Sequence, residues 1–94
     1  MFRPISPLAA QCLLAEAAAS ATGGRHEESL WYATADDRLV GAVAPAEAPP
    51  RWRLTIMRQT TDGRYLQQET HEGFEDVASA IQALAAALSR LAPP

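Results

Sequence analysis

The stretch from Leu30 to Thr70 constrains the fold most, because its strand-like runs are separated by two turn signals. The signals are Asp36-Asp37 and Thr61-Asp62-Gly63, and these residue types are typical of tight turns. Helix-like sequence flanks the stretch on both sides. The pattern predicts an α+β fold, in which a four-stranded antiparallel meander lies between an N-terminal and a C-terminal helix, in the order α-β-β-β-β-α.

Length and composition favour a single α+β domain over residues 1–94, since hydrophobic cores commonly span about 50–200 residues. The chain is 48% hydrophobic and 20% charged, as is typical of globular proteins. Its one cysteine excludes an internal disulfide, and we expect a cytoplasmic location. Apolar runs stay well short of the roughly 20 residues that cross a bilayer, so we expect no membrane partner.

The N-terminal segment predicts one helix that begins at Ser6-Pro7 and ends at Gly23-Gly24. Ser is a favoured N-cap, Pro is tolerated in the first helical turn, and Gly accepts the left-handed conformation of a C-cap. The few polar residues between these signals do not form one solvent face. We therefore expect this helix to be covered on more than one side, with Cys12 packed in the core.

Residues 29–35 and 38–44 predict the first hairpin, across a two-residue loop at Asp36-Asp37. In this register three pairs of residues face each other: Thr34 with Leu39, Tyr32 with Gly41, and Leu30 with Val43. An aromatic side chain can cover the gap that a glycine leaves on the neighbouring strand. We therefore expect Tyr32 to lie over Gly41.

The other face of this hairpin is also apolar, since it carries Trp31, Ala33, Val40 and Ala42. An antiparallel sheet with one solvated face alternates more clearly between apolar and polar residues. Either the N-terminal helix or another subunit must therefore cover this second face. We expect a homodimer with Trp31 and Val40 at its interface, and the side of the sheet that the helix covers stays open.

The second hairpin begins with an alternating strand over residues 51–59, whose large apolar residues share one face: Trp52, Leu54 and Ile56. A three-residue turn at Thr61-Asp62-Gly63 suits a hairpin with glycine in the left-handed conformation. It places Thr60 opposite Arg64, and Leu66 on the face of the large apolar residues. A two-residue turn would place Ile56 opposite Glu69, and we reject it as a poor cross-strand match.

The clearest element is an amphipathic helix over residues 74–91. Its large apolar residues recur at spacings of three and four along one stripe: Val77, Ile81, Leu84, Leu88 and Leu91. Acidic residues in its first turn and Arg90 in its last turn suit the helix dipole. We expect the stripe to pack on the sheet face that carries Leu54 and Ile56.

The opposite sheet face gives the leading functional hypothesis. We expect this face to be exposed in the monomer, with Arg53, Met57, Tyr65 and Gln67 forming a candidate protein-binding patch. Tyr, Met and Arg are enriched in protein interfaces, although an ordinary solvated sheet face is the alternative interpretation. The hypothesis is a small non-enzymatic protein-binding module, of the chaperone, inhibitor or adaptor type, whose protein partner is not identified.

The competing hypothesis is a nucleic-acid-binding protein that uses four strand arginines: Arg51, Arg53, Arg58 and Arg64. A sheet can present basic and aromatic side chains to a single strand. The formal net charge of −3 argues against a polyanionic partner. Polar residues at the sheet rims, His26, Glu28 and His71, raise the question whether they converge, but they lack the spacing of a metal site. We expect no enzyme activity, metal or cofactor.

Overall fold

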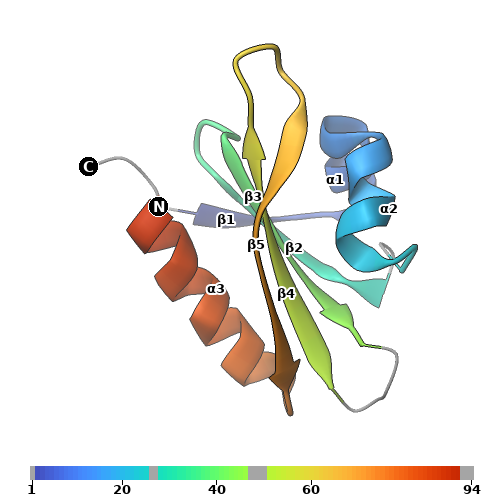
Figure 1. Ribbon diagram of the computed structural model, residues 1–94, viewed down its shortest axis with the longest axis vertical. Coiled ribbons are helices and arrows are strands. Elements are labelled where there is room, and N and C mark those ends of the chain that lie inside the picture. Colours follow the sequence, from blue (N-terminus) through green and yellow to red (C-terminus); the bar gives the residue numbers. More distant parts are fainter. Residues whose placement is uncertain (1, 26–27, 47–50, 92–94) are drawn as a thin grey trace.

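The computed structural model describes residues 2–25, 28–46 and 51–91, and it has an α+β fold. Its single antiparallel sheet has five strands in the order β1-β2-β3-β4-β5, so each strand pairs with the next one along the chain (Figure 1). The strands are β1 (Phe2–Ile5), β2 (Leu30–Thr34), β3 (Leu39–Pro45), β4 (Trp52–Gln59) and β5 (Tyr65–Phe74); the helices are α1 (Pro7–Leu14), α2 (Glu16–Thr22) and α3 (Val77–Leu91). The predicted fold class is confirmed, with one strand more than expected.

The additional strand is β1, which pairs antiparallel with β2 at one edge of the sheet. Arg3 anchors it, because its guanidinium donates to the Thr34 carbonyl at 2.7 Å and to the Asp37 carboxylate at 2.8 Å. Four residues that include Pro4 show no alternation long enough to predict a strand. Proline lacks an N–H donor, and an edge strand is the place in a sheet where this is tolerated.

The N-terminal helical segment has the predicted ends but is broken in its middle. The Ser6 hydroxyl accepts a hydrogen bond from the Ala9 N–H, and Gly23 closes α2 with φ +61°. Ala15 separates α1 from α2, because its φ of 54° and ψ of −123° cannot continue a helix. Both short helices lie on one side of the sheet and α3 lies on the other (Figure 1).

The register of the first hairpin is confirmed, since Tyr32 pairs with Gly41 and Leu30 with Val43. The link between the strands is longer than predicted, because β2 ends at Thr34 and β3 begins at Leu39. The space above Gly41 is not filled by the aromatic ring of Tyr32 alone. A Cβ built on Gly41 would overlap Cδ1 of Leu84, so a leucine of α3 occupies that space.

The three-residue turn of the second hairpin is also confirmed. The Thr60 N–H donates to the Arg64 carbonyl at 2.6 Å, and Gly63 has φ +89°. A register shift follows between the pairs of Ile56 and Met57, so Met57 lies opposite Gln67 while Ile56 lies opposite Glu69. The pairing that we rejected is therefore present, because an irregularity in β5 reaches it without changing the turn.

The sheet separates two hydrophobic clusters. The α3 cluster is built from large aliphatic side chains with two alanines of the helix: Leu39, Val43, Leu54, Ile56, Ala80, Leu84, Ala87 and Leu88. The α1/α2 cluster combines four bulky sheet residues with smaller ones and with α1 and α2: Trp31, Val40, Met57, Tyr65, Ala33, Ala42, Ala10, Leu14, Ala18 and Ala21. The amphipathic stripe of α3 thus packs where predicted, and both faces of the sheet are covered within one chain.

The structure corrects two expectations and qualifies a third. Trp31 and Val40 are fully buried beneath α1 and α2, so the surface expected at a dimer interface is closed inside the monomer. Leu66 pairs with Arg58 and so lies on the face of Leu54 and Ile56 as expected, but it is exposed near the hairpin tip. Cys12, expected in the core, is also exposed, because a short helix buries one side only and Cys12 lies on the other.

Candidate functional site

The predicted protein-binding patch does not form one exposed surface. Met57 and Tyr65 lie opposite α3 as expected, but they are only 3% and 7% exposed because α1 and α2 cover them. The Tyr65 hydroxyl donates to the Asp37 carbonyl at 2.6 Å, and burial raises the pKa of this phenol. Gln67 is exposed and Arg53 is partly exposed, so these two residues alone retain an outer surface.

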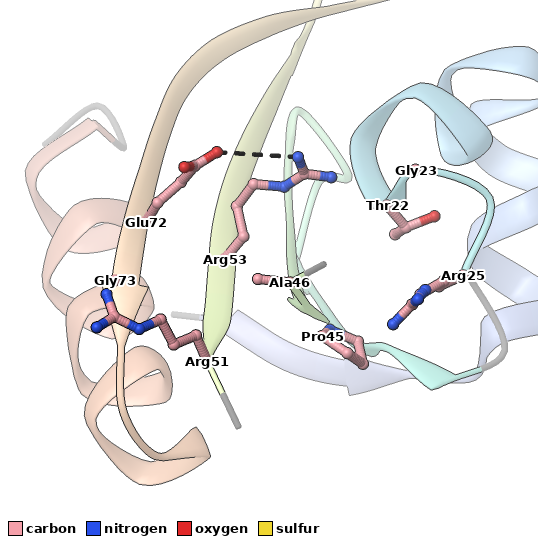
Figure 2. Close-up of a pocket in the computed structure, with 9 residues that line it drawn as sticks. All are labelled: Thr22, Gly23, Arg25, Pro45, Ala46, Arg51, Arg53, Glu72 and Gly73. Carbon is pink, nitrogen blue, oxygen red and sulfur yellow. Dashed lines mark ion pairs between the residues drawn. The ribbon is translucent and has the colours of Figure 1, made fainter. Parts of the chain in front are cut away.

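Arg53 lies instead in a pocket at the end of the sheet, where β3 ends, β4 begins and the last residues of β5 pass the C-terminal end of α2. The pocket has a volume of about 760 Å³ and is lined by the nine residues labelled in Figure 2. Its charged side chains are those of Arg25, Arg51, Arg53 and Glu72. We call it the arginine pocket.

The local sequence explains why these side chains meet. Arg53 alternates with Thr55 and Met57 on the sheet face beneath α1 and α2, at the end of β4 that these helices cover least. Gly23 ends α2 and turns the chain, so that Arg25 follows directly at the rim of the pocket. A Cβ on Gly23 would lie 3.4 Å from Nη2 of Arg53, so the guanidinium rests against the end of the helix. The partial negative charge there favours a cation.

The guanidinium of Arg53 is poorly matched by the groups around it. Nη1 lies 3.9 Å from Oε1 of Glu72, longer than the roughly 2.7–3.2 Å of a hydrogen bond. Nε is buried and has no acceptor among the residues that the structure describes. The side chain as a whole is 29% exposed, so it can still be reached from the pocket. Arg53 is thus a largely buried cation with unused donors, which favours the binding of an oxyanion.

The other two arginines of the pocket lie on different sides of Arg53. Arg25 points toward Pro45 in the space between α2 and the strand ends, whereas the guanidinium of Arg51 points away from Arg25 and Arg53, toward β5, in this view (Figure 2). Among the residues that the structure describes, three guanidinium groups therefore line the pocket against one carboxylate, that of Glu72. The pocket is locally positive in a chain whose formal net charge is −3.

The four arginines of the nucleic-acid hypothesis do not share one surface. Arg58 belongs to the α3 side, where it donates to the Gln68 side chain at 3.0 Å and to the Leu91 carbonyl at 3.3 Å. Arg64 pairs with Asp62 at 2.9 Å in the turn of the second hairpin. Arg51 and Arg53 lie at the opposite end of β4, which at about 3.3 Å per residue is roughly 25 Å long.

The polar residues at the sheet rims also separate. His26 lies outside the described residues, Glu28 is exposed, and His71 pairs with Glu69 at 2.9 Å. Glu69 also accepts from Arg90 of α3 at 2.7 Å, and these two partners lower its pKa to about 2. Within the described ranges, no group of three or more His, Cys, Asp or Glu residues could hold a metal ion.

A second hollow, of about 520 Å³, lies between the α1–α2 junction and the second hairpin. Its lining is more apolar than that of the arginine pocket, with Glu16 and Arg64 as its charged residues. It brings no cluster of like charges together. The arginine pocket is therefore the stronger candidate site.

Sequence reasoning named Arg51 and Arg53 but missed the pocket that contains them. Arg25 follows a glycine pair and Glu72 sits in a polar strand, so neither carries a recognisable motif. The missing information was the position of α2, because its end places Arg25 beside strands that lie more than 20 residues further along the chain. A local sequence signal for the pocket is Arg25, which directly follows the helix stop at Gly23-Gly24.

Comparisons with known proteins leave the site to be interpreted from its geometry. No family model matches the chain, and neither a curated protein nor a solved structure matches it. Among the helices that the structure describes, none is long and apolar enough to cross a membrane.

Proposed function

We propose that this protein is a non-enzymatic protein-binding module that holds an acidic segment of a partner protein in the arginine pocket. The observation that carries the proposal is Arg53, a largely buried guanidinium whose Nε has no acceptor in the described part of the chain. A buried donor without a partner costs free energy, about 1–3 kcal/mol or more for a charged group. A carboxylate that enters the pocket can accept hydrogen bonds from the Nη nitrogens and place an opposite charge beside this incompletely paired cation.

Carboxylates of a protein suit the pocket better than a nucleic acid does. None of the nine lining residues that the structure describes is aromatic, so the described part of the pocket offers no platform on which a base could stack. The formal net charge of −3 would repel a long polyanion, whereas a short acidic segment interacts mainly with the local arginines. The planar guanidinium also matches the two oxygens of a carboxylate.

The charged groups of the pocket favour binding over catalysis. Arginine remains protonated in proteins and therefore cannot serve as a general base. Glu72 is the one carboxylate among the lining residues that the structure describes, and none of these residues offers a second acid or base beside it to relay a proton. These groups can orient and neutralise an anion.

The proposal is tested with a fluorescein-labelled oligoglutamate peptide, whose binding is followed by fluorescence anisotropy at low salt. Arg53→Gln removes the charge and the guanidinium fork, and we expect it to weaken binding by about tenfold or more, as for other charge-assisted hydrogen bonds. Arg25→Gln should weaken it by a smaller factor. Arg64→Gln is the matched control, because it removes the same charge from a residue that lies outside the pocket.

Three outcomes would contradict the proposal. The first is an unlabelled oligolysine peptide that competes as well as unlabelled oligoglutamate. The second is an equal loss of affinity in Arg64→Gln and Arg53→Gln, which would indicate general charge attraction. The third is a single-stranded oligonucleotide that binds more tightly than oligoglutamate and loses affinity in Arg58→Gln, which would favour the nucleic-acid hypothesis. Thermal melting of each variant establishes that it is folded.

A further inference from the structure

We infer that Glu72 is an internal competitor for Arg53, and that a ligand carboxylate displaces it when it enters the arginine pocket. The inference rests on the proposed function and adds a means by which the chain itself sets the affinity of that site.

Two glutamates of β5 pair with arginines in different ways. Glu69 accepts a hydrogen bond from Arg90 of α3 at 2.7 Å, and its side chain is 19% exposed. Glu72 approaches Arg53 only to 3.9 Å, and its side chain is 68% exposed. A glutamate on this strand can therefore form a close ion pair, and Glu72 does not. The contact between Glu72 and Arg53 is Coulombic attraction without a hydrogen bond.

The backbone beside Glu72 departs from a regular strand. Gly73 has φ +89°, and a register shift separates the pair of Trp52 from the pair of Leu54. Such irregularities bend a strand and re-aim its side chains. A Cβ on Gly73 would meet nothing within 4 Å, so this part of β5 lies at an open edge. Glu72 can thus turn toward solvent without disturbing the core.

A ligand carboxylate can satisfy Arg53 where Glu72 cannot. Two oxygens that enter from the pocket can accept from two guanidinium nitrogens at once, a geometry that arginine favours. The Glu72 carboxylate lies 3.9 Å from Nη1 of Arg53, outside hydrogen-bond distance. The carboxylates of Glu72 and of the ligand compete for the guanidinium of Arg53. The attraction between Glu72 and Arg53 is therefore lost when the ligand binds. Exposed ion pairs of this kind are worth up to about fivefold in an equilibrium constant.

The test is Glu72→Gln, which keeps the shape of the side chain and removes its charge. We expect this variant to bind the labelled oligoglutamate peptide about twofold to fivefold more tightly than the unchanged protein. Glu16→Gln is the matched control, since it makes the same charge change on α2, in the second hollow. We expect the control to alter the affinity by a clearly smaller factor, because Glu16 does not line the arginine pocket.

Each result supports or overturns the inference. A larger gain in Glu72→Gln than in Glu16→Gln supports it. Equal gains in both variants, or no gain in Glu72→Gln, overturn it while the effect of Arg53→Gln leaves the proposed function standing. An unchanged affinity in Arg53→Gln would contradict the proposed function itself, whatever Glu72→Gln does. Melting curves of both glutamate variants separate these outcomes from loss of the fold.

Discussion

The two faces of the sheet are covered by different means. On one face, the single amphipathic helix α3 packs leucines against leucine, valine and isoleucine of the sheet. On the other face, the broken segment α1–α2 places mostly alanines over four large sheet residues: Trp31, Val40, Met57 and Tyr65. The large side chains of the α1/α2 cluster therefore come mainly from the sheet, and the helices contribute mostly small ones. The α3 face takes its bulk from both the helix and the strands, whereas the α1/α2 face takes it mainly from the strands.

This difference explains the position of the arginine pocket. The continuous helix α3 has one apolar stripe, and it covers its side of the sheet along its whole length of 15 residues. Two short helices of eight and seven residues cover a smaller area and end at Gly23, short of the first residues of β4 and the last residues of β5. The arginine pocket therefore forms where α2 ends and no longer covers the sheet, and Arg53 lies at this boundary.

The largest effect is expected from Trp31→Ala on the α1/α2 face, because Trp31 is the largest fully buried side chain beneath α1 and α2. Full truncation of a buried tryptophan costs about 3–5 kcal/mol. Urea unfolding, followed by the remaining Trp52, measures the loss. Leu84→Ala is the control on the α3 face, with an expected cost of about 2–5 kcal/mol.

Hydrogen exchange distinguishes the two variants further. We expect Trp31→Ala to reduce the protection of amides in α1 and α2 more than in α3, and Leu84→Ala to do the reverse. If both variants reduced protection equally in all three helices, the two faces would unfold as one cooperative unit. The stability of the protein could then not be divided between the two faces.

The next effect concerns the close approach of α3 to β3. In Gly41→Ala the new methyl group would overlap Cδ1 of Leu84 and lie 3.3 Å from Cδ1 of Ile56. Overpacking of this kind costs about 1–3 kcal/mol. Leu84→Ala removes the overlapping atom, so the double variant should lose less stability than the sum of the two single changes. Additive losses in urea unfolding would show that Leu84 does not occupy the space above Gly41.

The sequence predicted what depends on local patterns. The amphipathic stripe of α3, the register of Tyr32 with Gly41, and the turn at Thr61-Asp62-Gly63 follow from periodicity and turn chemistry. The break at Ala15 could not be predicted, since alanine is the best helix former and gives no stop signal. That one residue directs α2 across the sheet, and this decides whether Met57 and Tyr65 are buried or exposed.

The arginine pocket was beyond prediction for a related reason. Its charged residues come from three separate segments, and they meet only once α2 is placed and β5 bends at Gly73. Irregular backbone of this kind is determined by tertiary packing rather than by local sequence. The sequence indicated that the second sheet face needed a cover, and the short helices provided it within one chain.

Ala15→Gly tests the break itself and should stabilise the protein. Only glycine adopts a φ of 54° with a ψ of −123° without strain, so we expect a gain of about 1 kcal/mol in the free energy of unfolding. Ala19→Gly is the matched control, because Ala19 is an exposed interior residue of α2 and glycine there costs about 1 kcal/mol. A loss of stability in both variants would mean that the segment is a continuous helix in solution.

The smallest effect concerns the ion pair that joins β5 to α3. Arg90 and His71 lower the pKa of Glu69 from its usual 4.5 to about 2, so the folded protein favours the ionised carboxylate. This contribution to stability is fully present above pH 4.5 and is lost as the pH falls toward 2, because the unfolded chain takes up the proton first. Glu69→Gln should therefore be less stable than the unchanged protein at neutral pH, and the difference should narrow across this window. Arg90→Gln should also be less stable than the unchanged protein at neutral pH, and this difference should narrow over the same pH window. The double variant Glu69→Gln/Arg90→Gln should lose little more stability than either single variant. A difference that stays constant down to pH 2 would show that Glu69 stabilises the α3 side by packing rather than by charge.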